Sequence, residues 1–415
     1  MPREGRHVKQ RVGAGVAVLS VVTLILGGLA PEASAEDLRP HQWYLKTMQA
    51  PDMWKVSKGR GITVAVVDSG VKASLPELRG KVLPGKDFSS SSTGAHHDTN
   101  GHGTNMAALI AGSGAGGGIQ GLAPEAKILP VRVPLGGRRV DFATDSTQSK
   151  AIRYAADHGA KVINMSIGSA GAAELSPESQ RAVNYALRKG SLIFAAAGND
   201  RKRGNPPVVP AGLPGVVGVA SVDRSAQASK FSSYGDQVSL AAPGEDIPEY
   251  CTKIKGRACI GQGTSQATAL TSASAALIWS KHPTWTNYQV LRVMMQTAGR
   301  PDWGDIPSDY VGYGAVRPRL ALLEGKGKPG PPDVNPLLAR EGSNLPKPSA
   351  SASASASAKP APSADPKSPA PAPSGKEAEA ASDSGGSGKG VWIGVGAAAV
   401  VLAGAAVAVF VRRRR

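Results

Sequence analysis

Residues 61–70 read GITVAVVDSG, and their pattern indicates the fold class. Its apolar, β-branched run from Ile62 to Val67 has no alternating polar residues, which predicts a short strand buried on both faces. Asp68 directly follows the run. In sheets of parallel strands with helices on both faces, ligands bind at the carboxyl ends of the strands, so Asp68 is a candidate functional residue.

Further apolar runs alternate with helical patterns along the chain. The predicted strands are 127–133, 162–166, 192–197 and 216–222, and the predicted helices are 144–158 and 176–190. Continuously apolar strands that alternate with helices are typical of parallel sheets covered on both faces. We therefore expect an α/β fold with a doubly wound parallel sheet and helices on both faces.

Two more polar residues stand where this architecture places a site. His102 lies in NGHGT (100–104), where a helical pattern begins, and Ser265 lies in GTSQA (263–267), at the head of a long helix of small residues. Each residue alone has an ordinary explanation as a turn former, a loop residue or a helix cap. Together they supply a hydroxyl nucleophile, a base that can take its proton, and a carboxylate that orients the base.

The order Asp, His, Ser and the contexts DSG, GHGT and GTS resemble the subtilisin-like serine proteases, and the match covers about 61–323. The resemblance implies a catalytic triad, with Asn199 in AAAGN (195–199) as the oxyanion-stabilising amide. It also implies that a peptide substrate pairs with the chain edge at Ser166, Ile167 and Gly168. No cofactor is expected, and no metal site is predicted from the scattered Asp and Asn residues.

The serine motif departs from that family at two positions. Gln266 stands where a bulky apolar residue is usual, and Ala269 stands where the family motif ends in proline. Neither change removes a proton-transfer group, so we expect activity to be retained. Gln266 is expected to alter the substrate preference beside the nucleophile.

The start of the chain predicts export. Residues 1–35 have a basic start, an apolar stretch and the small-residue triplet Ala33-Ser34-Ala35, which together are typical of a signal peptide cleaved before Glu36. The alternative is an uncleaved membrane anchor, because the apolar stretch is long.

The end of the chain predicts a membrane anchor. Residues 326–390 are rich in Pro, Ala and Ser and are expected to form a disordered linker. Residues 391–411 carry no charge and are long enough to span a bilayer, although a buried core helix is the alternative. The arginines at 412–415 predict a cytoplasmic tail. A peptidase domain at 61–325 would then face the outside of the cell membrane.

Residues 36–60 indicate which group of subtilisin-like proteases the chain resembles. Trp43, Tyr44 and Trp54 in this segment, with the predicted anchor, resemble mycosins, the membrane-anchored subtilisin-like proteases that accompany type VII secretion. The resemblance implies an N-terminal extension packed on the catalytic domain, with these aromatics as apolar anchors. It implies protein substrates and a secretion membrane complex as partners. The alternatives are a general cell-surface protease and a mainly structural stabiliser of such a complex.

Charge and cysteine content exclude two other classes. The net charge of +17 is partly explained by arginines and lysines that flank the apolar ends, and no aromatic residues are interleaved with basic ones, so nucleic acid is not an expected partner. The chain has two cysteines, Cys251 and Cys259, too few for a four-ligand zinc site. In an exported protein they predict a local disulfide, with two buried free thiols as the alternative.

Overall fold

The computed structural model describes residues 37–89, 93–135, 142–170, 177–251, 258–300 and 304–338. All of these belong to the first of two units of the chain, Met1–Pro346, whereas the second unit is Lys347–Arg415. The predicted signal peptide (1–35), membrane span (391–411) and basic tail (412–415) lie outside the described residues. Within the described ranges, no helix has both the length and the apolar character needed to cross a bilayer.

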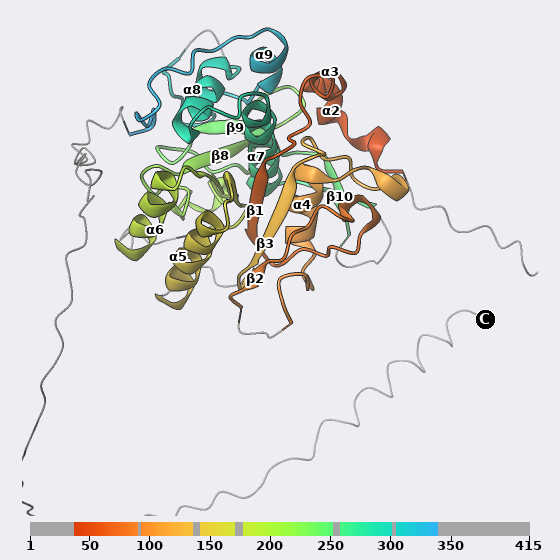
Figure 1. Cartoon of the computed structure of the whole chain (residues 1–415). Helices are drawn as coiled ribbons and strands as arrows, with labels where there is room; N and C mark the ends of the chain where they lie inside the picture. Colours follow the sequence, from red (N-terminus) through yellow and green to blue (C-terminus); the bar gives the residue numbers. More distant parts are fainter. Residues whose placement is uncertain are drawn as a thin grey trace, which may run out of the picture. The chain divides into compact units, whose positions relative to one another are not determined.

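The centre of the fold is a seven-stranded sheet whose strands all run parallel (Figure 1). The strands, in spatial order, are β2 (Lys86–Asp87), β3 (Lys127–Arg132), β1 (Thr63–Asp68), β4 (Val162–Met165), β6 (Leu192–Ala196), β8 (Val217–Val222) and β9 (Leu240–Pro243). The predicted parallel α/β sheet is therefore confirmed. Sequence patterning missed β2, which has only 2 residues, and β9, whose residues Leu-Ala-Ala-Pro include no β-branched side chain.

The position of β1 in the sheet explains where a crevice forms. This first strand pairs with β3 on one side and with β4 on the other, so the strand order reverses beside it. Crossover connections leave in opposite directions at such a point, which opens a crevice at the carboxyl ends of the strands. Asp68 is the last residue of β1 rather than the residue after it, and Ser166 directly follows β4.

Helices cover both faces of the sheet (Figure 1). Val64 and Val66 of β1 belong to the core that contains α4 (His102–Ala111) and α7 (Thr264–Lys281). The intervening Ala65 and Val67 belong to the core of α5 (Phe142–Asp157) and α6 (Pro177–Arg188). Successive side chains of a strand point to opposite faces, so an all-apolar strand needs both layers. The shorter α8 (Asn287–Thr297) and α9 (Pro318–Leu323) pack on the α7 side.

Helix α7 runs through the core and is built from small residues. Nearly all of its side chains from Thr264 to Trp279 are buried. Three of its buried hydroxyls are satisfied within the helix, since Thr268, Thr271 and Ser274 each donate to the backbone carbonyl four residues earlier. The buried Ser272 hydroxyl donates instead to Asn164 of β4, at 3.0 Å. The helix can therefore lie close to the sheet without leaving buried hydroxyl groups unpaired, which fixes the position of Ser265 near its start.

The segment before β1 packs on the domain. It contains η1 (Arg39–His41), α2 (Trp43–Thr47) and α3 (Ala50–Met53). Tyr44 is fully buried, the Trp43 indole donates to the carbonyl of Glu245 at 3.2 Å, and the Trp54 indole donates to that of Leu122 at 2.8 Å. Trp43 and Trp54 are partly buried against the same core cluster that contains Tyr44.

Residues 326–338 also pack on the domain, although their composition assigns them to the predicted linker. The Thr286 hydroxyl donates to the Pro332 carbonyl at 2.7 Å, and the Gln289 amide donates to the Gly330 carbonyl at 2.9 Å. Proline and glycine make this segment look like a linker in sequence. It is held instead by its backbone carbonyls, which carry no compositional signal.

Candidate active site

A cleft of about 360 Å³ opens at the carboxyl ends of β3, β4 and β6. Its lining includes six residues singled out from the sequence, namely His102, Ser166, Ile167, Gly168, Asn199 and Ser265. Asp68 does not line the cleft and is fully buried behind His102. Residues from four different segments of the chain therefore meet at one place.

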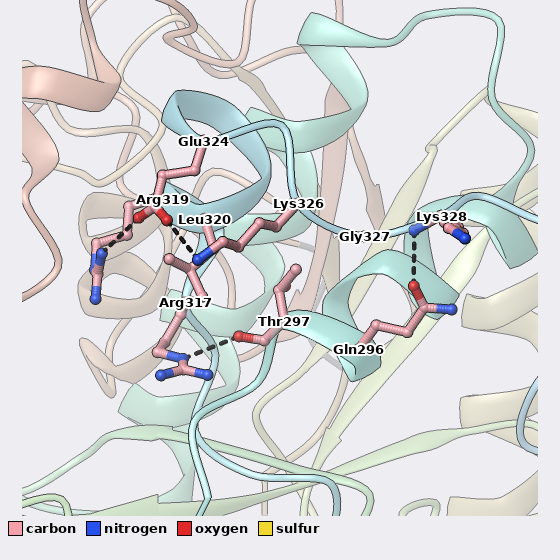
Figure 2. A pocket seen from close by; sticks show the side chains of 9 residues that line it. All are labelled: Gln296, Thr297, Arg317, Arg319, Leu320, Glu324, Lys326, Gly327 and Lys328. Carbon is pink, nitrogen blue, oxygen red and sulfur yellow. Dashed lines mark hydrogen bonds and ion pairs between the residues drawn. The ribbon is translucent and has the colours of Figure 1, made fainter.

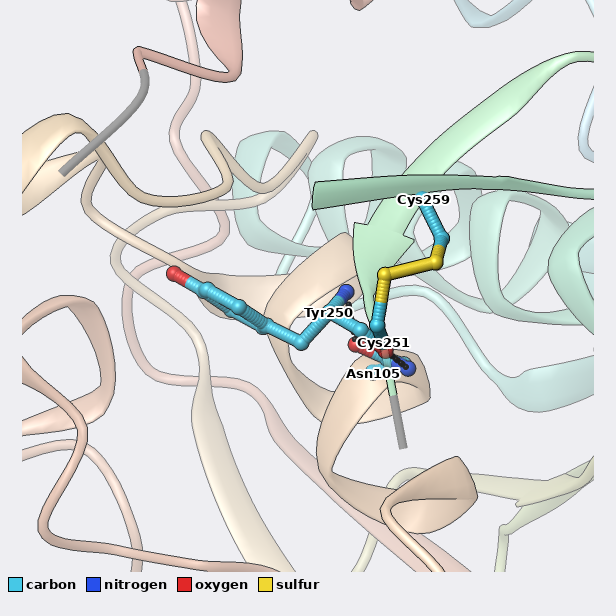
Figure 3. Close-up of a disulfide and its surroundings, with 4 residues drawn as sticks. All are labelled: Asn105, Tyr250, Cys251 and Cys259. Carbon is cyan, nitrogen blue, oxygen red and sulfur yellow. Dashed lines mark hydrogen bonds between the residues drawn. A yellow bond between two sulfur atoms is a disulfide. The ribbon is translucent and has the colours of Figure 1, made fainter. Parts of the chain in front are cut away.

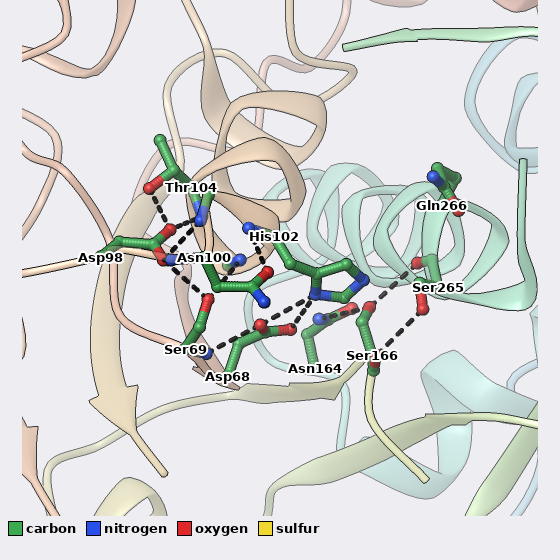
Figure 4. A network of polar contacts seen from close by, with 12 residues as sticks. Asp68, Ser69, Asp98, Asn100, His102, Thr104, Asn164, Ser166, Ser265 and Gln266 are labelled. Atoms are coloured by element: carbon green, nitrogen blue, oxygen red, sulfur yellow. Dashed lines mark hydrogen bonds and ion pairs between the residues drawn. The ribbon is translucent and has the colours of Figure 1, made fainter. Parts of the chain in front are cut away.

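The Asp68 carboxylate and the His102 imidazole are in direct contact (Figure 4). The imidazole Nδ1 lies 2.8 Å from Oδ1 and 2.9 Å from Oδ2 of the Asp68 carboxylate. The Ser69 backbone N–H also donates to Oδ1, at 2.7 Å. The His102 side chain is 29% exposed, so its outer face remains open to a substrate. A carboxylate on Nδ1 fixes the tautomer that leaves Nε2 free to accept a proton.

The loop before α4 places His102 over this carboxylate. Asp98 accepts hydrogen bonds from the backbone N–H of Gly101 at 2.7 Å and of Thr104 at 2.9 Å, and from the Ser69 hydroxyl at 2.8 Å. Gly101 has φ +84°, a left-handed conformation that suits glycine. Asp98 thereby ties the first turn of α4 to the end of β1. Sequence reasoning missed this role, and its only signal was an Asp four residues before the histidine.

The Ser265 hydroxyl points into the cleft but is bound to the backbone of the neighbouring strand end. It donates to the Ser166 carbonyl at 2.9 Å, and the Ser166 hydroxyl donates in return to the Ser265 carbonyl at 2.9 Å. No hydrogen bond joins Ser265 to His102, both of which the structure describes. Bonds between nucleophile and base are often loose in substrate-free sites.

Asn199 lies in the turn after β6, and its amide is oriented by the start of α7. Its Oδ1 accepts from the Thr264 backbone N–H at 2.9 Å and from the Thr264 hydroxyl at 3.1 Å. Because these donors occupy the oxygen, the amide nitrogen is the group left to face the cleft. Thr264 is fully buried and is a second functional residue that sequence reasoning missed.

The charge balance of the site favours a protonated His102. Burial lowers the pKa of the imidazole, but the Asp68 charge and hydrogen bond, with smaller contributions from Glu249 and Asp98, raise that pKa to about 9.

Gln266 does not face the cleft, in contrast to the expectation that it shapes the substrate preference there. Its side chain is only 4% exposed, and its amide donates to the Glu249 carboxylate at 3.0 Å. Adjacent residues on a helix point in different directions, so Ser265 and Gln266 face different surroundings.

A second hollow, of about 740 Å³, lies beside α8 and α9 (Figure 2). Three of the cations that line it are bonded to other groups of the domain. Arg317 donates to the Thr297 carbonyl at 3.0 Å, and Arg319 and Lys326 both pair with Glu324. It contains no Ser, Cys or His that could act as a nucleophile or base. The cleft at His102 is therefore the candidate active site, although it is the smaller of the two.

Two further expectations concern the cysteines and metals. The structure places the sulfur atoms of Cys251 and Cys259 at bonding distance, with their Cα atoms 5.2 Å apart (Figure 3). Across the described ranges, no group of three or more His, Cys, Asp or Glu side chains is arranged to hold a metal ion.

The chain resembles proteins of known activity. The model of the subtilase family matches residues 59–318. Thermitase from Thermoactinomyces vulgaris is 40% identical over 243 residues, which are 58% of this chain and 82% of thermitase. The major intracellular serine protease of Bacillus subtilis is 37% identical over 244 residues, which are 57% of this chain and 74% of that protease.

Solved structures give the same family. MycP1 from Mycobacterium smegmatis superimposes with a TM-score of 0.61 at 28% identity, covering 74% of this chain and 89% of that one. The MycP3 protease from the type VII (ESX-3) secretion system superimposes with a TM-score of 0.59 at 32% identity, covering 71% and 90%. A family match over more than half of the chain, with relatives that are serine proteases, leaves one conclusion: the chain belongs to the subtilase family of serine proteases.

Proposed function

We propose that the protein is an endopeptidase that cleaves peptide bonds through Ser265, with His102 as the general base and Asp68 as the residue that orients it. The observation that carries this proposal is the bond from His102 Nδ1 to the buried Asp68 carboxylate, made in the same cleft that contains the Ser265 hydroxyl. A serine hydroxyl is a weak nucleophile at neutral pH and needs a base positioned in this way.

The first half of the reaction forms an acyl-enzyme. The Ser265 hydroxyl leaves the Ser166 carbonyl and gives its proton to His102 Nε2 as its oxygen attacks the peptide carbonyl carbon. The imidazolium then donates that proton to the leaving amine as the C–N bond breaks. In the second half, water loses a proton to the same nitrogen and attacks the ester carbonyl carbon. The imidazolium then returns that proton to Ser265 Oγ as the ester C–O bond breaks, which releases the acid and restores the hydroxyl.

Two donors are placed to stabilise the oxyanion. The Asn199 amide nitrogen faces the cleft because its oxygen is held by Thr264, and the Ser265 backbone N–H lies in the first turn of α7, where it has no partner within the helix. Both donors are set before the substrate arrives, so they cost little reorganisation when negative charge develops.

The cleft favours an extended segment of protein as the substrate. Ser166, Ile167 and Gly168 leave the sheet after β4 and line the cleft with backbone as well as side chains. Backbone groups can pair with any extended peptide, and such pairing needs no chain end, so we assign cleavage within chains.

We also infer a cellular setting. The structural likeness to MycP1 and MycP3, with the predicted signal peptide (1–35) and membrane span (391–411), supports a mycosin that is anchored in the cell membrane and acts with a type VII secretion system. Residues 36–60 then form an N-terminal extension that packs on the catalytic domain, and Cys251 and Cys259 form a disulfide outside the cytoplasm.

The test of the chemistry is Ser265→Ala in the purified protein, with Ser280→Ala as the matched control. Ser280 lies on the same helix, where its hydroxyl donates to the Arg60 carbonyl away from the cleft. Ser265→Ala should lower turnover of an unfolded protein substrate by at least about 1,000-fold and abolish labelling by a serine-directed phosphonate, whereas Ser280→Ala keeps both. Retained turnover in Ser265→Ala contradicts the proposed function.

The same variant tests the cellular setting. In the native host, Ser265→Ala should impair export of the secretion substrates if proteolysis serves secretion. Normal export in Ser265→Ala cells, together with loss of export when the whole gene is deleted, would instead indicate a structural stabiliser. Rapid digestion of unrelated unfolded proteins by the purified enzyme would support a general cell-surface protease.

A further inference from the structure

The two groups of the proposed triad that exchange a proton stand on separate helices. His102 begins α4 and Ser265 is the second residue of α7, so the distance between base and nucleophile depends on how these helices are held relative to each other. A hairpin inserted between β9 and α7 touches both of them. It consists of β10 (Ile247–Tyr250) and β11 (Ala258–Gly261), which pair antiparallel.

The hairpin is fixed to α4 through Asn105, which lies one turn after His102 (Figure 3). The Asn105 Oδ1 accepts from the Tyr250 backbone N–H at 2.9 Å, and Nδ2 donates to the Tyr250 carbonyl at 3.1 Å. Asn105 is 2% exposed. One side chain thus satisfies both backbone groups of Tyr250, as a neighbouring strand would, and no small rotation can keep both bonds.

The same hairpin is fixed to α7 through Gln266, the residue next to Ser265. Gln266 Nε2 donates to Glu249 Oε2 at 3.0 Å, and Glu249 is the neighbour of Tyr250 on β10. The other end of the Gln266 amide, Oε1, is buried without a hydrogen-bond partner, and it lies 2.8 Å from where a Cβ on Gly263 would stand. The bond to Glu249 is therefore the polar contact that orients this side chain.

The paired cysteines close the hairpin at the strand ends that carry these contacts. Cys251 directly follows Tyr250, and Cys259 lies opposite Glu249 in the strand register. A covalent link at this point holds the end of β10, which carries Glu249 and Tyr250, against β11. Both contacts, one to each helix, start from this end of β10.

We propose that the β10–β11 hairpin, closed by Cys251 and Cys259, is a clasp that sets the position of His102 relative to Ser265, with Asn105, Glu249 and Gln266 as positioning residues. The proposal rests on the triad proposed above. It gives Gln266 a role in aligning the nucleophile helix rather than in contacting the substrate. Displacement of a reacting group by about 1 Å can cost on the order of 100-fold in rate, so a clasp of this kind acts on turnover.

Glu249 adds an electrostatic effect to its positioning role. The carboxylates that face His102 come from three elements: Asp68 from the end of β1, Asp98 from the loop before α4, and Glu249 from β10. All of them raise the pKa of the imidazole. Burial raises the pKa of Glu249 itself, whereas the Gln266 hydrogen bond and the His102 charge lower it. The carboxylate thus links the two helices by charge as well as by geometry.

The first test compares Gln266→Met and Glu249→Gln in the full-length protein. Methionine has a similar length but no donor, so Gln266→Met should lower kcat about tenfold while KM stays within about twofold. Glu249→Gln keeps an acceptor for Gln266 and loses only the charge. It should keep kcat within about twofold and move the acidic limb of the kcat/KM profile to lower pH. The matched control is Ile260→Thr, on the same hairpin but 58% exposed.

The second test uses the cysteines, because the chain contains only these two. Reduction of the wild-type protein should lower kcat several-fold without changing KM, and reoxidation should restore it. Cys251→Ser combined with Cys259→Ser should show the lower kcat and no response to the reductant. This test decides the matter if Gln266→Met fails to fold.

The clasp is overturned if folded Gln266→Met has wild-type kcat, or if reduction leaves kcat unchanged. It is also overturned if Ile260→Thr lowers kcat as much as Gln266→Met, because the effect would then be a general loosening of the hairpin. Failure of the proposed triad would be seen in a different experiment, as activity retained by Ser265→Ala. The two proposals can therefore fail independently.

Discussion

Gly103 marks the closest approach of α4 to the end of β1. A Cβ at this position would stand 2.9 Å from Asp68 Cβ and closer still to the Gly70 carbonyl oxygen. Real Cβ atoms do not make such contacts with backbone, so the helix would have to move. The glycine after the histidine is therefore what permits the imidazole to reach the buried carboxylate.

We predict that Gly103→Ala displaces His102 and lowers kcat/KM by about 100-fold, with a folded protein by circular dichroism. The matched control is Gly80→Ala, where an added Cβ meets nothing within 4 Å. Its φ of +73° should make that control cost about 1 kcal/mol of unfolding free energy with no loss of activity. Equal activity in the two variants would show that α4 tolerates the shift.

The environment of His102 predicts how the activity depends on pH. His102 must be neutral to accept the Ser265 proton, and its pKa is raised to about 9. We expect kcat/KM to rise through neutral pH and level off only in the alkaline range. The Asp68–His102 pair should stabilise the fold fully below the pKa of an unfolded histidine, and this contribution should be lost as pH rises through about 9.

The measurement for this prediction is a pH–rate profile of the wild-type protein beside Asp68→Asn. Asparagine removes the charge that raises the imidazole pKa, so the rising limb should move to lower pH. The plateau should also fall, by about 10,000-fold, because the tautomer is no longer fixed. A limb that stays in place in Asp68→Asn would mean that another group controls it.

At the scale of elements, the segment that carries α2 and α3 contributes to the core although it precedes the first strand. Leu38, Tyr44, Met48 and Met53 all belong to the cluster that contains α4 and α7. Tyr44 is fully buried, and its hydroxyl oxygen accepts a hydrogen bond from the Gln42 amide. The segment before β1 thus contributes side chains to the hydrophobic core of the domain.

We predict that Tyr44→Ala lowers the free energy of unfolding by about 3–5 kcal/mol, because it leaves a cavity in this core. Urea unfolding followed by fluorescence gives the value. Lys46→Ala, at an exposed position of the same helix, should change it by less than about 0.5 kcal/mol. A similar, small effect for both variants would mean that the segment does not support the domain.

At the scale of the molecule, the packed domain extends past the start of the predicted linker. Arg292 donates to the Pro331 carbonyl at 2.9 Å, and Gln289 and Thr286 hold Gly330 and Pro332. These contacts tie the chain to α8 after α9 has ended. A boundary chosen by composition, at residue 325, would cut them.

We therefore predict that a chain ending at residue 338 keeps wild-type activity and thermal stability, whereas one ending at residue 325 loses about 2–4 kcal/mol of unfolding free energy with the hydrogen bonds to α8. Differential scanning calorimetry and peptide hydrolysis on both fragments provide the comparison. Equal stability would mean that residues 326–338 contribute nothing to the fold.

Local pattern determined much of this protein. The apolar runs gave five of the seven parallel strands, because a strand buried on both faces has to be apolar throughout. The candidate residues Asp68, His102 and Ser265 could be found because each stands at a strand end or a helix start, with glycines beside it. The short strands β2 and β9, and the role of Asp98, left too little pattern to detect.

Contacts between side chains from distant parts of the chain could be read only from the folded structure. The Ser265 hydroxyl bonds to Ser166, 99 residues away, and Gln266 turns from the cleft to Glu249 on the preceding hairpin. Sequence periodicity says which residues share a face of one element, but not which face of another element meets them. That choice is made when helices and strands pack at their own angles and distances. For this reason the residue types of the site were evident from the sequence, whereas the alignment of its two helices was not.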